Sequence, residues 1–490
     1  MGQHEIVDDK GQYVEERIEY SAATPVDGEA QVVNEKALLR KIDFKLVPWL
    51  ALLYLLSFLD RSNIGNANLF GLSKHLGLSA TEYGACLAIF FGFYVLFEVP
   101  SNMVMKAWRP SLWIPTIMIG WGIVMTGMGF VKNFEGLLVA RLFLGITEAG
   151  LFPGVSFYLT QWYKRYEISF RISLFFSAAT AAGAFGGLLA RLINLMDGVS
   201  GFHGWQWIFI LEGILTVIVG IISVWMMCDY PATAKFLTPE EREAVKARLL
   251  LDNDGCSGEY KNRFIRDAFF DWKVWVFAIM FQGCLVPLYC FSLFSPTLVA
   301  NLGYTAATAQ LMSVPPYIVA AVTTVLAGYL SDRLQRRGVV IMGFAGLATV
   351  GFVMLVSNQI HGVNYAGLFL AAAGVYPLIP VIISWGTNNC GGSLKKSVGS
   401  AIIVSVGNVG GIISSFIYPS TDKPLYTKGH AICAGYCAVT VFLAFVMNRY
   451  YTRQNRLKEE RIIARGGWTE EEKAAYKDEG DNVDWFKYVI

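Results

Sequence analysis

The sequence predicts an all-α membrane protein with twelve transmembrane helices arranged in two pseudo-symmetric six-helix halves. Three observations support this fold class. Of the 490 residues, 54% are hydrophobic and only 16% are charged, whereas about one quarter of a soluble protein of this length would be charged. Apolar runs of about 18 residues or more recur along the chain. One long charged segment, residues 229–272, divides these runs into two sets of six.

Each apolar run is predicted to be one membrane-spanning helix, and the loops between them are short. The predicted spans are residues 44–68, 83–106, 111–131, 135–162, 170–195, 205–228, 273–300, 306–331, 338–357, 363–386, 397–419 and 429–451.

The composition of the remaining segments completes the domain organisation. Residues 1–40 are polar and acidic and have no apolar run typical of a signal peptide, so they are predicted to be a disordered cytosolic tail. The N-terminal bundle is expected over 41–228 and the C-terminal bundle over 273–451. The linker 229–272 is predicted to be cytosolic with one amphipathic helix at 238–251, and residues 452–490 to be a charged cytosolic tail with a short surface helix near TEEEKAAY.

Loop charges predict the orientation. Cytosolic loops of membrane proteins carry an excess of Lys and Arg, and one side of the predicted bundle is much the more basic. That side carries Arg40, Lys41, Lys45, Lys106, Arg109, Lys164, Arg165, Arg171, Arg333, Arg336, Arg337, Lys395, Lys396, Arg449, Arg453 and Arg456. The sequence therefore predicts a multi-pass protein, expected in the plasma membrane, with both termini in the cytosol.

Several classes of function are disfavoured. Most of the eight Cys lie in apolar segments without a CxxC motif, and the His residues do not cluster, so we expect packing roles and no metal or cofactor. The basic residues lie in short loops with no interleaved aromatics, which disfavours nucleic-acid binding. The absence of a nucleophile–base constellation disfavours an enzyme. The expected partners are the lipid bilayer, a small substrate and protons, and the protein is expected to function as a monomer.

A repeated basic hairpin supports the division into two halves. GYLSDRLQRRG follows the predicted eighth helix, and EVPSNMVMKAWRP follows the second helix at the equivalent place. Asp332 is expected to cap a helix end or to pair with basic residues across the cytosolic face. Asn102 occupies the corresponding position in the first half, with Glu98 one turn earlier. We predict a cytosolic gate formed by Glu98, Asn102, Asp332 and Arg333.

Ionisable side chains within the predicted spans indicate where the function lies. Such a group costs roughly 2.5–3.5 kcal/mol at bilayer depth on insertion scales, and it persists when it is paired or faces a wet cavity. Seven charged residues lie well inside the spans or, in the case of Arg191 and Glu212, nearer the surface, and all seven occur in the first six helices: Asp60, Arg61, Glu98, Arg141, Glu148, Arg191 and Glu212. The last six helices instead carry amides and aromatics, including Gln282 and Asn408. We interpret this asymmetry as a division of roles: the first half binds charge and protons, and the second half shapes the substrate site.

Depth arithmetic places two arginines together. With a rise of 1.5 Å per residue, Arg61 lies roughly 22 Å from the cytosolic end of its helix and Arg141 roughly 9 Å from the outer end of its own. Across a core of about 30 Å the two guanidiniums share a layer. Glu148 follows Arg141 by seven residues and lies on the same helix face, two turns deeper. Two arginine guanidiniums can each donate a pair of hydrogen bonds to a carboxylate ligand, and the nearby carboxylates could take up a proton.

The sequence leaves open which charges pair. Asp60 with Arg61, and Arg141 with Glu148, could be compensating pairs that lock helices together. Adjacent residues point about 100° apart on a helix, so Asp60 and Arg61 cannot both face a pore. Arg191 and Glu212 both fall nearer the outer surface and could pair with each other.

Five motifs, in order, carry a resemblance to a known family. They are LSFLDRSNIGNANLFGL, FFGFYVLFEVPSN, RLFLGITEAGLFPGVSFYLTQWY, WIFILEGI and DYPATAKFLTPEER. From about residue 40 to residue 450 the chain resembles the fungal anion:cation symporters of the major facilitator superfamily, the allantoate permease family. GYLSDRLQRRG likewise resembles the G-x-L-x-D-R-x-x-R-R signature of that superfamily.

The resemblance implies proton-coupled import of a small organic anion, a vitamin or carboxylate such as nicotinate, by alternating access. It implies that Arg61 and Arg141 contact the substrate carboxylate, that Asp60 and Glu148 couple protons, and that Asn408 binds substrate. Gln282 and Asn63 are predicted as further substrate contacts.

The chain also departs from the family pattern, and other functions remain open. Gln206 stands where the family often has Arg, and Arg191 where an uncharged residue is expected, so the substrate can differ. One alternative is a drug–proton antiporter on the same fold, although the Gly-rich segment AATAAGAFGGLLA lacks the Pro typical of those proteins. The other is a nutrient sensor that does not transport.

Overall fold

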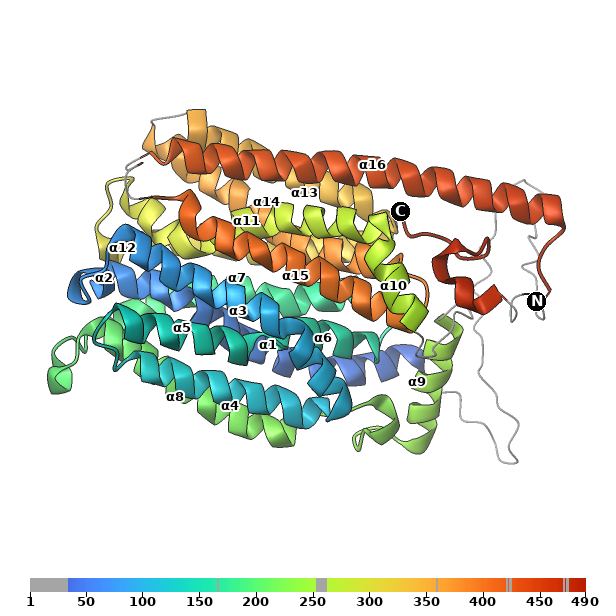
Figure 1. Ribbon diagram of the computed structural model, residues 1–490, viewed down its shortest axis with the longest axis horizontal. Helices are drawn as coiled ribbons and strands as arrows, with labels where there is room; N and C mark the ends of the chain where they lie inside the picture. The colour runs from blue at the N-terminus through green and yellow to red at the C-terminus, as the bar shows by residue number, and fades with distance from the viewer. Residues whose placement is uncertain are drawn as a thin grey trace.

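The computed structural model describes residues 34–164, 167–252, 262–357, 360–419, 422, 425–469, 472 and 476–490. Within these residues, twelve helical segments are long and apolar enough to cross a membrane, which confirms the predicted fold class. They run side by side along the long axis of the molecule (Figure 1). Most of the predicted N-terminal tail lies outside the described residues, and the first helix begins at Glu35, earlier than expected.

The first six spans correspond to the predicted N-terminal bundle. They are α1 (Glu35–Leu69), α3 (Ala80–Ala107), α4 (Pro110–Met128), α5 (Phe134–Glu148) continued by α6 (Leu151–Thr160), α7 (Ile168–Asn194) and α8 (Gly204–Met226). A single-turn helix, α2 (Leu72–His75), follows α1.

The second six spans follow the linker. They are α11 (Trp272–Ala300), α12 (Ala306–Leu334), α13 (Arg337–Ser357), α14 (His361–Asn388), α15 (Ser393–Ile417) and α16 (Thr427–Arg465). We use the term basic end for the end of the bundle where α1 begins and α16 ends, and opposite end for the other.

The two halves repeat one packing scheme. In the first half α1 packs on α7, α3 on α5 and α4 on α8; in the second, α11 packs on α15, α12 on α14 and α13 on α16. The halves meet mainly where α7 lies along α12 and α3 along α15. Gly328 of α12 lies directly against Ser173 of α7 with no room for a Cβ, so a small residue here sets how closely the halves approach.

The linker between the halves contains two helices at the basic end, α9 (Pro239–Asp252) and α10 (Asn262–Phe270). The first matches the predicted amphipathic helix, and the second was not predicted. Ion pairs hold α9 to the first half: Arg248 lies 2.7 Å from Glu35 and 2.7 Å from Glu167, and Lys41 lies 2.6 Å from Glu241.

The C-terminal segment corrects the predicted domain boundary. The last helix continues past residue 451 to Arg465, and residues 481–490 pack against the basic end of the second half instead of forming a surface tail. Trp385 Nε1 donates to the Val489 carbonyl at 2.8 Å, and Asn389 exchanges two hydrogen bonds with the Val489 backbone. Apolar side chains drive this docking, because Phe486 and Val489 are almost fully buried. The surface helix predicted near residue 472 lies mostly outside the described residues.

A buried ion cluster anchors this segment. The Asp481 carboxylate is fully buried, accepts from Lys395 Nζ at 2.5 Å and forms a second ion pair with Lys273. Burial alone would raise the pKa of Asp481, but the charges of Lys273 and Lys395 outweigh it and hold that pKa well below its usual range. Asp481 therefore stays ionised, and its ion pairs persist, throughout the neutral and mildly acidic range.

We expect Asp481→Asn to release the C-terminal segment. Removing one partner of a buried ion pair costs about 3 kcal/mol or more, so hydrogen-exchange protection of residues 483–490 should fall about 100-fold at neutral pH. The matched control is Asp484→Asn, because Asp484 pairs with an exposed arginine, Arg461, and should lose little protection. In the wild type the lowered pKa places the loss of this stabilisation on the acid side, below about pH 4. Equal loss of protection in both variants would contradict the anchoring role of Asp481.

Candidate functional site

A buried ion pair joins α1 to the end of α5. Arg61 Nη2 lies 2.7 Å from Glu148 Oε1, and Arg61 Nε donates to the same oxygen at 3.2 Å. Ser57, one turn earlier on α1, also donates to that oxygen, at 2.5 Å. Glu148 is fully buried and Arg61 is 6% exposed. Three donors therefore converge on one carboxylate oxygen in the middle of the first half, and they fix the Arg61 side chain.

A break in the helix positions Glu148. The span Phe134–Thr160 is interrupted between α5 and α6, directly after Glu148. Pro153 has no N–H and its ring clashes with the carbonyl four residues earlier, that of Ala149, which prevents a continuous helix. Gly150 lies so close to Ser101 of α3 that no Cβ fits. Broken helices in membranes occur where the backbone is buried in protein or lines a cavity.

Hydrogen bonds connect the Arg61–Glu148 ion pair to the second half. Arg61 Nη1 donates to the Tyr289 hydroxyl of α11 at 3.0 Å, and that hydroxyl donates to Asn408 Oδ1 of α15 at 2.8 Å. Asn408 Nδ2 in turn donates to Glu98 Oε2 of α3 at 3.4 Å. The chain of contacts crosses the boundary between the halves twice, so any relative movement of the halves must break or rearrange it.

Arg141 lies beside this network with unused donors. Its guanidinium carbon is 5.7 Å from the centre of the Phe90 ring, and that of Arg61 is 5.3 Å from the same ring. The close approach of α5 to α3 follows from Gly145, which lies against the backbone of Phe90. Arg141 is 1% exposed, and its Nε and Nη1 have no hydrogen-bond partner among the described residues. The two guanidiniums thus lie near the same aromatic ring.

The charge pairs considered from the sequence differ from those in the structure. Arg61 pairs with Glu148, and neither Asp60–Arg61 nor Arg141–Glu148 forms an ion pair within the described residues. Asp60 turns away from the boundary between the halves, because its position on α1 is rotated from that of Arg61. Its Oδ2 accepts from Trp121 Nε1 of α4 at 3.0 Å and from Thr216 Oγ1 of α8 at 2.8 Å.

The proposed pair of Arg191 and Glu212 does not form in the described structure. Arg191 is exposed on α7, whereas Glu212 is 2% exposed, within the bundle. Neither Glu212 oxygen has a hydrogen-bond partner among the described residues.

The four predicted gate residues occupy different environments. Glu98 belongs to the central network through Asn408. Asp332 of α12 accepts from the Phe170 backbone N–H at the start of α7 at 2.8 Å, and its other oxygen lies 3.5 Å from Arg337. Arg333 is exposed and donates to Tyr329 of its own helix. Asn102 lines the cavity described next.

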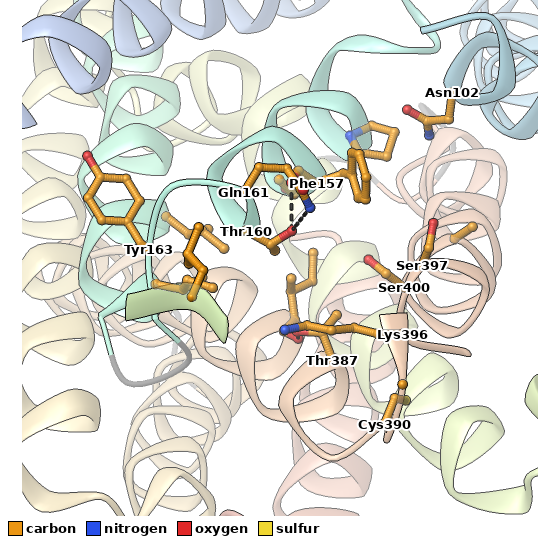
Figure 2. Close-up of a pocket in the computed structure, with 18 of the residues that line it drawn as sticks. Asn102, Phe157, Thr160, Gln161, Tyr163, Thr387, Cys390, Lys396, Ser397 and Ser400 are labelled. Atoms are coloured by element: carbon orange, nitrogen blue, oxygen red, sulfur yellow. Dashed lines mark hydrogen bonds between the residues drawn. The ribbon is translucent and has the colours of Figure 1, made fainter. Parts of the chain in front are cut away.

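A cavity of about 220 Å³ separates the halves at the basic end (Figure 2). Both halves contribute polar side chains to its wall, among them Asn102, Ser156, Thr160, Gln161, Thr387, Lys396, Ser397 and Ser400, and Phe486 of the C-terminal segment completes the lining. Pro153 also lines it, one turn beyond Glu148. The cavity therefore reaches from the basic end toward the helix break beside the ion pair.

Near the opposite end the halves are in direct contact. Gln310 of α12 donates to Asn66 of α1 at 3.2 Å, and Gly183 of α7 lies against the Tyr317 ring. Asn63, predicted as a substrate contact, is fully buried here and accepts from Asn66 at 3.3 Å. Gln282, also predicted as a substrate contact, is half-buried on α11 two turns from Tyr289 and lies next to Gly410 of α15.

The sequence reasoning missed Ser57 and Phe90 of the central network as site residues, and it counted Tyr289 only among the aromatics of the second half. Ser57 precedes Arg61 by four residues, so helical spacing could have placed it on the same face. Tyr289 and Phe90 lie in apolar runs where nothing distinguishes them from packing aromatics, and only the arrangement of the helices brings them to the arginines.

These features define a class of protein. Two six-helix halves, a polar network that spans them and a cavity at one end are the architecture of a membrane transporter. The family model of the Major Facilitator Superfamily matches residues 50–415. The chain belongs to that superfamily.

Relatives and solved structures agree with this membership. The chain is 39% identical to the MFS-type transporter cnsO of Penicillium expansum over 82% of this chain and 80% of the other. It is 31% identical to the high-affinity nicotinic acid transporter of Saccharomyces cerevisiae, over 94% of this chain and 86% of the other. The proton:xylose symporter XylE shares the fold with a TM-score of 0.63 at 17% identity, covering 84% of this chain and 95% of the other.

We expect the Arg61–Glu148 pair to show strong coupling in a double-mutant cycle. Arg61→Met or Glu148→Gln alone leaves one buried charge uncompensated and should cost about 3–5 kcal/mol, whereas the double variant removes both charges and should recover most of that loss. Thermal unfolding in detergent measures the difference. Arg456→Met, whose side chain is 82% exposed, is the control and should change stability little. Additive losses in the double variant would show that the two charges do not stabilise each other.

Proposed function

We propose that the protein imports a small organic anion together with protons by alternating access, as a member of the allantoate permease group of fungal anion:cation symporters. Two buried guanidiniums near one another, one of which donates to Tyr289 of the second half, support an anionic substrate. The 31% identity to a yeast nicotinic acid transporter favours a monocarboxylate with a ring, for which nicotinate is the first candidate.

The observation that carries this proposal is the fully buried Arg141 guanidinium, two nitrogens of which have no hydrogen-bond partner among the described residues. A buried cation without hydrogen-bond partners is costly, and an incoming carboxylate would offset that cost. Arg141 would bind the carboxylate first. Once Glu148 releases Arg61, the Arg61 guanidinium would also donate hydrogen bonds to the carboxylate. Phe90, whose ring lies near both guanidiniums, would contact a planar ring.

Glu148 would couple transport to protons through competition for Arg61. While Glu148 is ionised, it holds Arg61, and when it takes up a proton, the attraction between the two weakens and Arg61 can bind the anion. Binding of substrate and proton would then favour each other, which is the requirement for symport. Asp60, on the other side of α1, would be the second proton-coupling residue.

The cavity at the basic end and the contact between the halves at the opposite end support the proposed orientation in the membrane and the proposed alternating access. If the basic end faces the cytosol, as the positive-inside rule favours, the cavity is the path to the cytosol and both termini are cytosolic. The contacts of Gln310 with Asn66 and of Tyr317 with Gly183 would then close the outer path. We place the protein in the plasma membrane and expect the monomer to suffice, because one chain contains both halves.

We expect Arg141→Ala to reduce uptake of labelled nicotinate about 100-fold or more, because the variant loses charge-assisted hydrogen bonds to the carboxylate. Uptake is measured in transporter-deficient yeast cells, with surface abundance checked in parallel. Arg456→Ala should transport normally. Normal uptake by Arg141→Ala would refute the carboxylate contact. If the wild type takes up no nicotinate, a panel of vitamin and carboxylate anions, together with cationic drugs, distinguishes another anion from a drug antiporter.

We expect Glu148→Gln to separate transport from the proton gradient. A neutral amide cannot hold Arg61 as an ionised carboxylate does, so the variant should still exchange labelled for unlabelled substrate. Accumulation driven by an inward proton gradient should fall about tenfold or more. Comparison of exchange with gradient-driven uptake in proteoliposomes measures both. Loss of exchange with intact proton dependence would instead assign Glu148 to substrate binding.

A further inference from the structure

A second carboxyl lies beside Asp60 and has no role in the central network. Glu212 of α8 is 2% exposed, and both its oxygens lack hydrogen-bond partners among the described residues. One turn further along α8, Thr216 donates to Asp60 Oδ2, so α8 brings Glu212 next to the Asp60 carboxyl, with which it interacts electrostatically. Asp60 Oδ1 is likewise unpartnered. Two buried carboxyls therefore share one site between α1, α4 and α8.

No cation among the described residues compensates this pair. The span of α4 contributes Trp121 but no charged residue, and α7 contributes Arg191, whose side chain is exposed. From α1, the neighbouring Arg61 is directed to Glu148 instead. Two adjacent ionised carboxylates without a cation would repel each other in a medium of low dielectric, so at most one of them can carry a charge.

The hydrogen bonds decide which carboxyl carries the charge. Asp60 Oδ2 accepts from two fully buried donors, Trp121 Nε1 and Thr216 Oγ1, and such bonds stabilise the ionised form. Glu212 accepts none from the described residues. The proton of the pair therefore resides on Glu212 in this conformation.

We propose that Glu212 and Asp60 form a proton-sharing pair that holds one proton and passes it between its members during transport. When the proton moves, an O–H bond of Glu212 breaks, an O–H bond forms on Asp60, and the net charge of the pair remains −1. Neutralising Asp60 changes the field at its neighbour Arg61, and so links this pair to the Arg61–Glu148 ion pair on the other face of α1. This inference rests on the proposed proton coupling and adds Glu212 to it.

The first test does not depend on any substrate. Infrared spectra of the purified full-length protein at neutral pH should contain a carboxylic-acid C=O band that Glu212→Gln removes. The control Glu135→Gln changes an exposed glutamate at the start of α5 and should remove no such band. If Glu212→Gln folds and removes no band, Glu212 is ionised and the proposal is overturned.

The second test measures transport in proteoliposomes, with labelled nicotinate as the probe. Glu212→Gln should keep exchange within about twofold of the wild type and reduce proton-driven accumulation about tenfold. Accumulation equal to that of the wild type would overturn the proposal. If the wild type does not carry nicotinate, the proposed substrate is refuted. The infrared experiment alone then tests whether Glu212 and Asp60 share a proton.

A third variant tests the pair even if Glu212→Gln does not fold. Thr216→Val preserves shape but removes one donor from Asp60, so Asp60 should hold the proton up to a higher pH. The midpoint of the pH profile of proton-driven accumulation, or of the infrared band where nicotinate is not carried, should move up by about one unit. An unchanged midpoint would show that Asp60 is not part of the titrating pair.

Discussion

One constraint organises the centre of this protein: Arg61 must meet Glu148 inside a bundle that excludes water. An unpaired charge at this depth costs several kcal/mol, so both side chains have to be delivered accurately to the same point. Glu148, the last residue of α5 before the break, pairs with Arg61 of α1, and Ser57 adds a donor from the same face of α1. Tyr289 and Asn408 then connect the pair to the other half, so the electrostatic centre also contributes a polar contact between the two bundles.

The fold was predictable from the sequence because its causes are local. The length of each apolar run, the charged linker and the amphipathic pattern of α9 are visible in the chain. They predicted twelve spans whose ends are in error by a few residues, except that α1 begins earlier, at Glu35, and α16 ends later, at Arg465. The docked C-terminal segment was not predictable. Its many charges are typical of a solvated tail. The apolar side chains of Phe486 and Val489 become buried only because they pack against helices that are distant in sequence.

The candidate site was predictable in its composition and depth but not in its pairing. Helix rise placed Arg61 and Arg141 in one layer, and in the structure both lie against Phe90. Rotation about the helix axis could not be assigned, so the sequence left open whether Asp60 or Arg61 faces the other half. In the structure the adjacent residues diverge, with Arg61 directed to the boundary and Asp60 to α4 and α8. One helix thereby serves two separate acidic sites, one with Glu148 and one beside Glu212.

The placement of charges on α5 has a consequence for biogenesis. The span Phe134–Thr160 shares the lowest mean hydropathy of the twelve, 1.4, and carries both Arg141 and Glu148. Inserted alone, two such charges would oppose entry into the bilayer by roughly 5–7 kcal/mol on insertion scales. The helices that receive them, α1 with Arg61 and α3 with Phe90, are synthesised first. The order of the helices along the chain thus lets the translocon release this span against partners already in the membrane, so that insertion of this span and formation of the Arg61–Glu148 pair become one event.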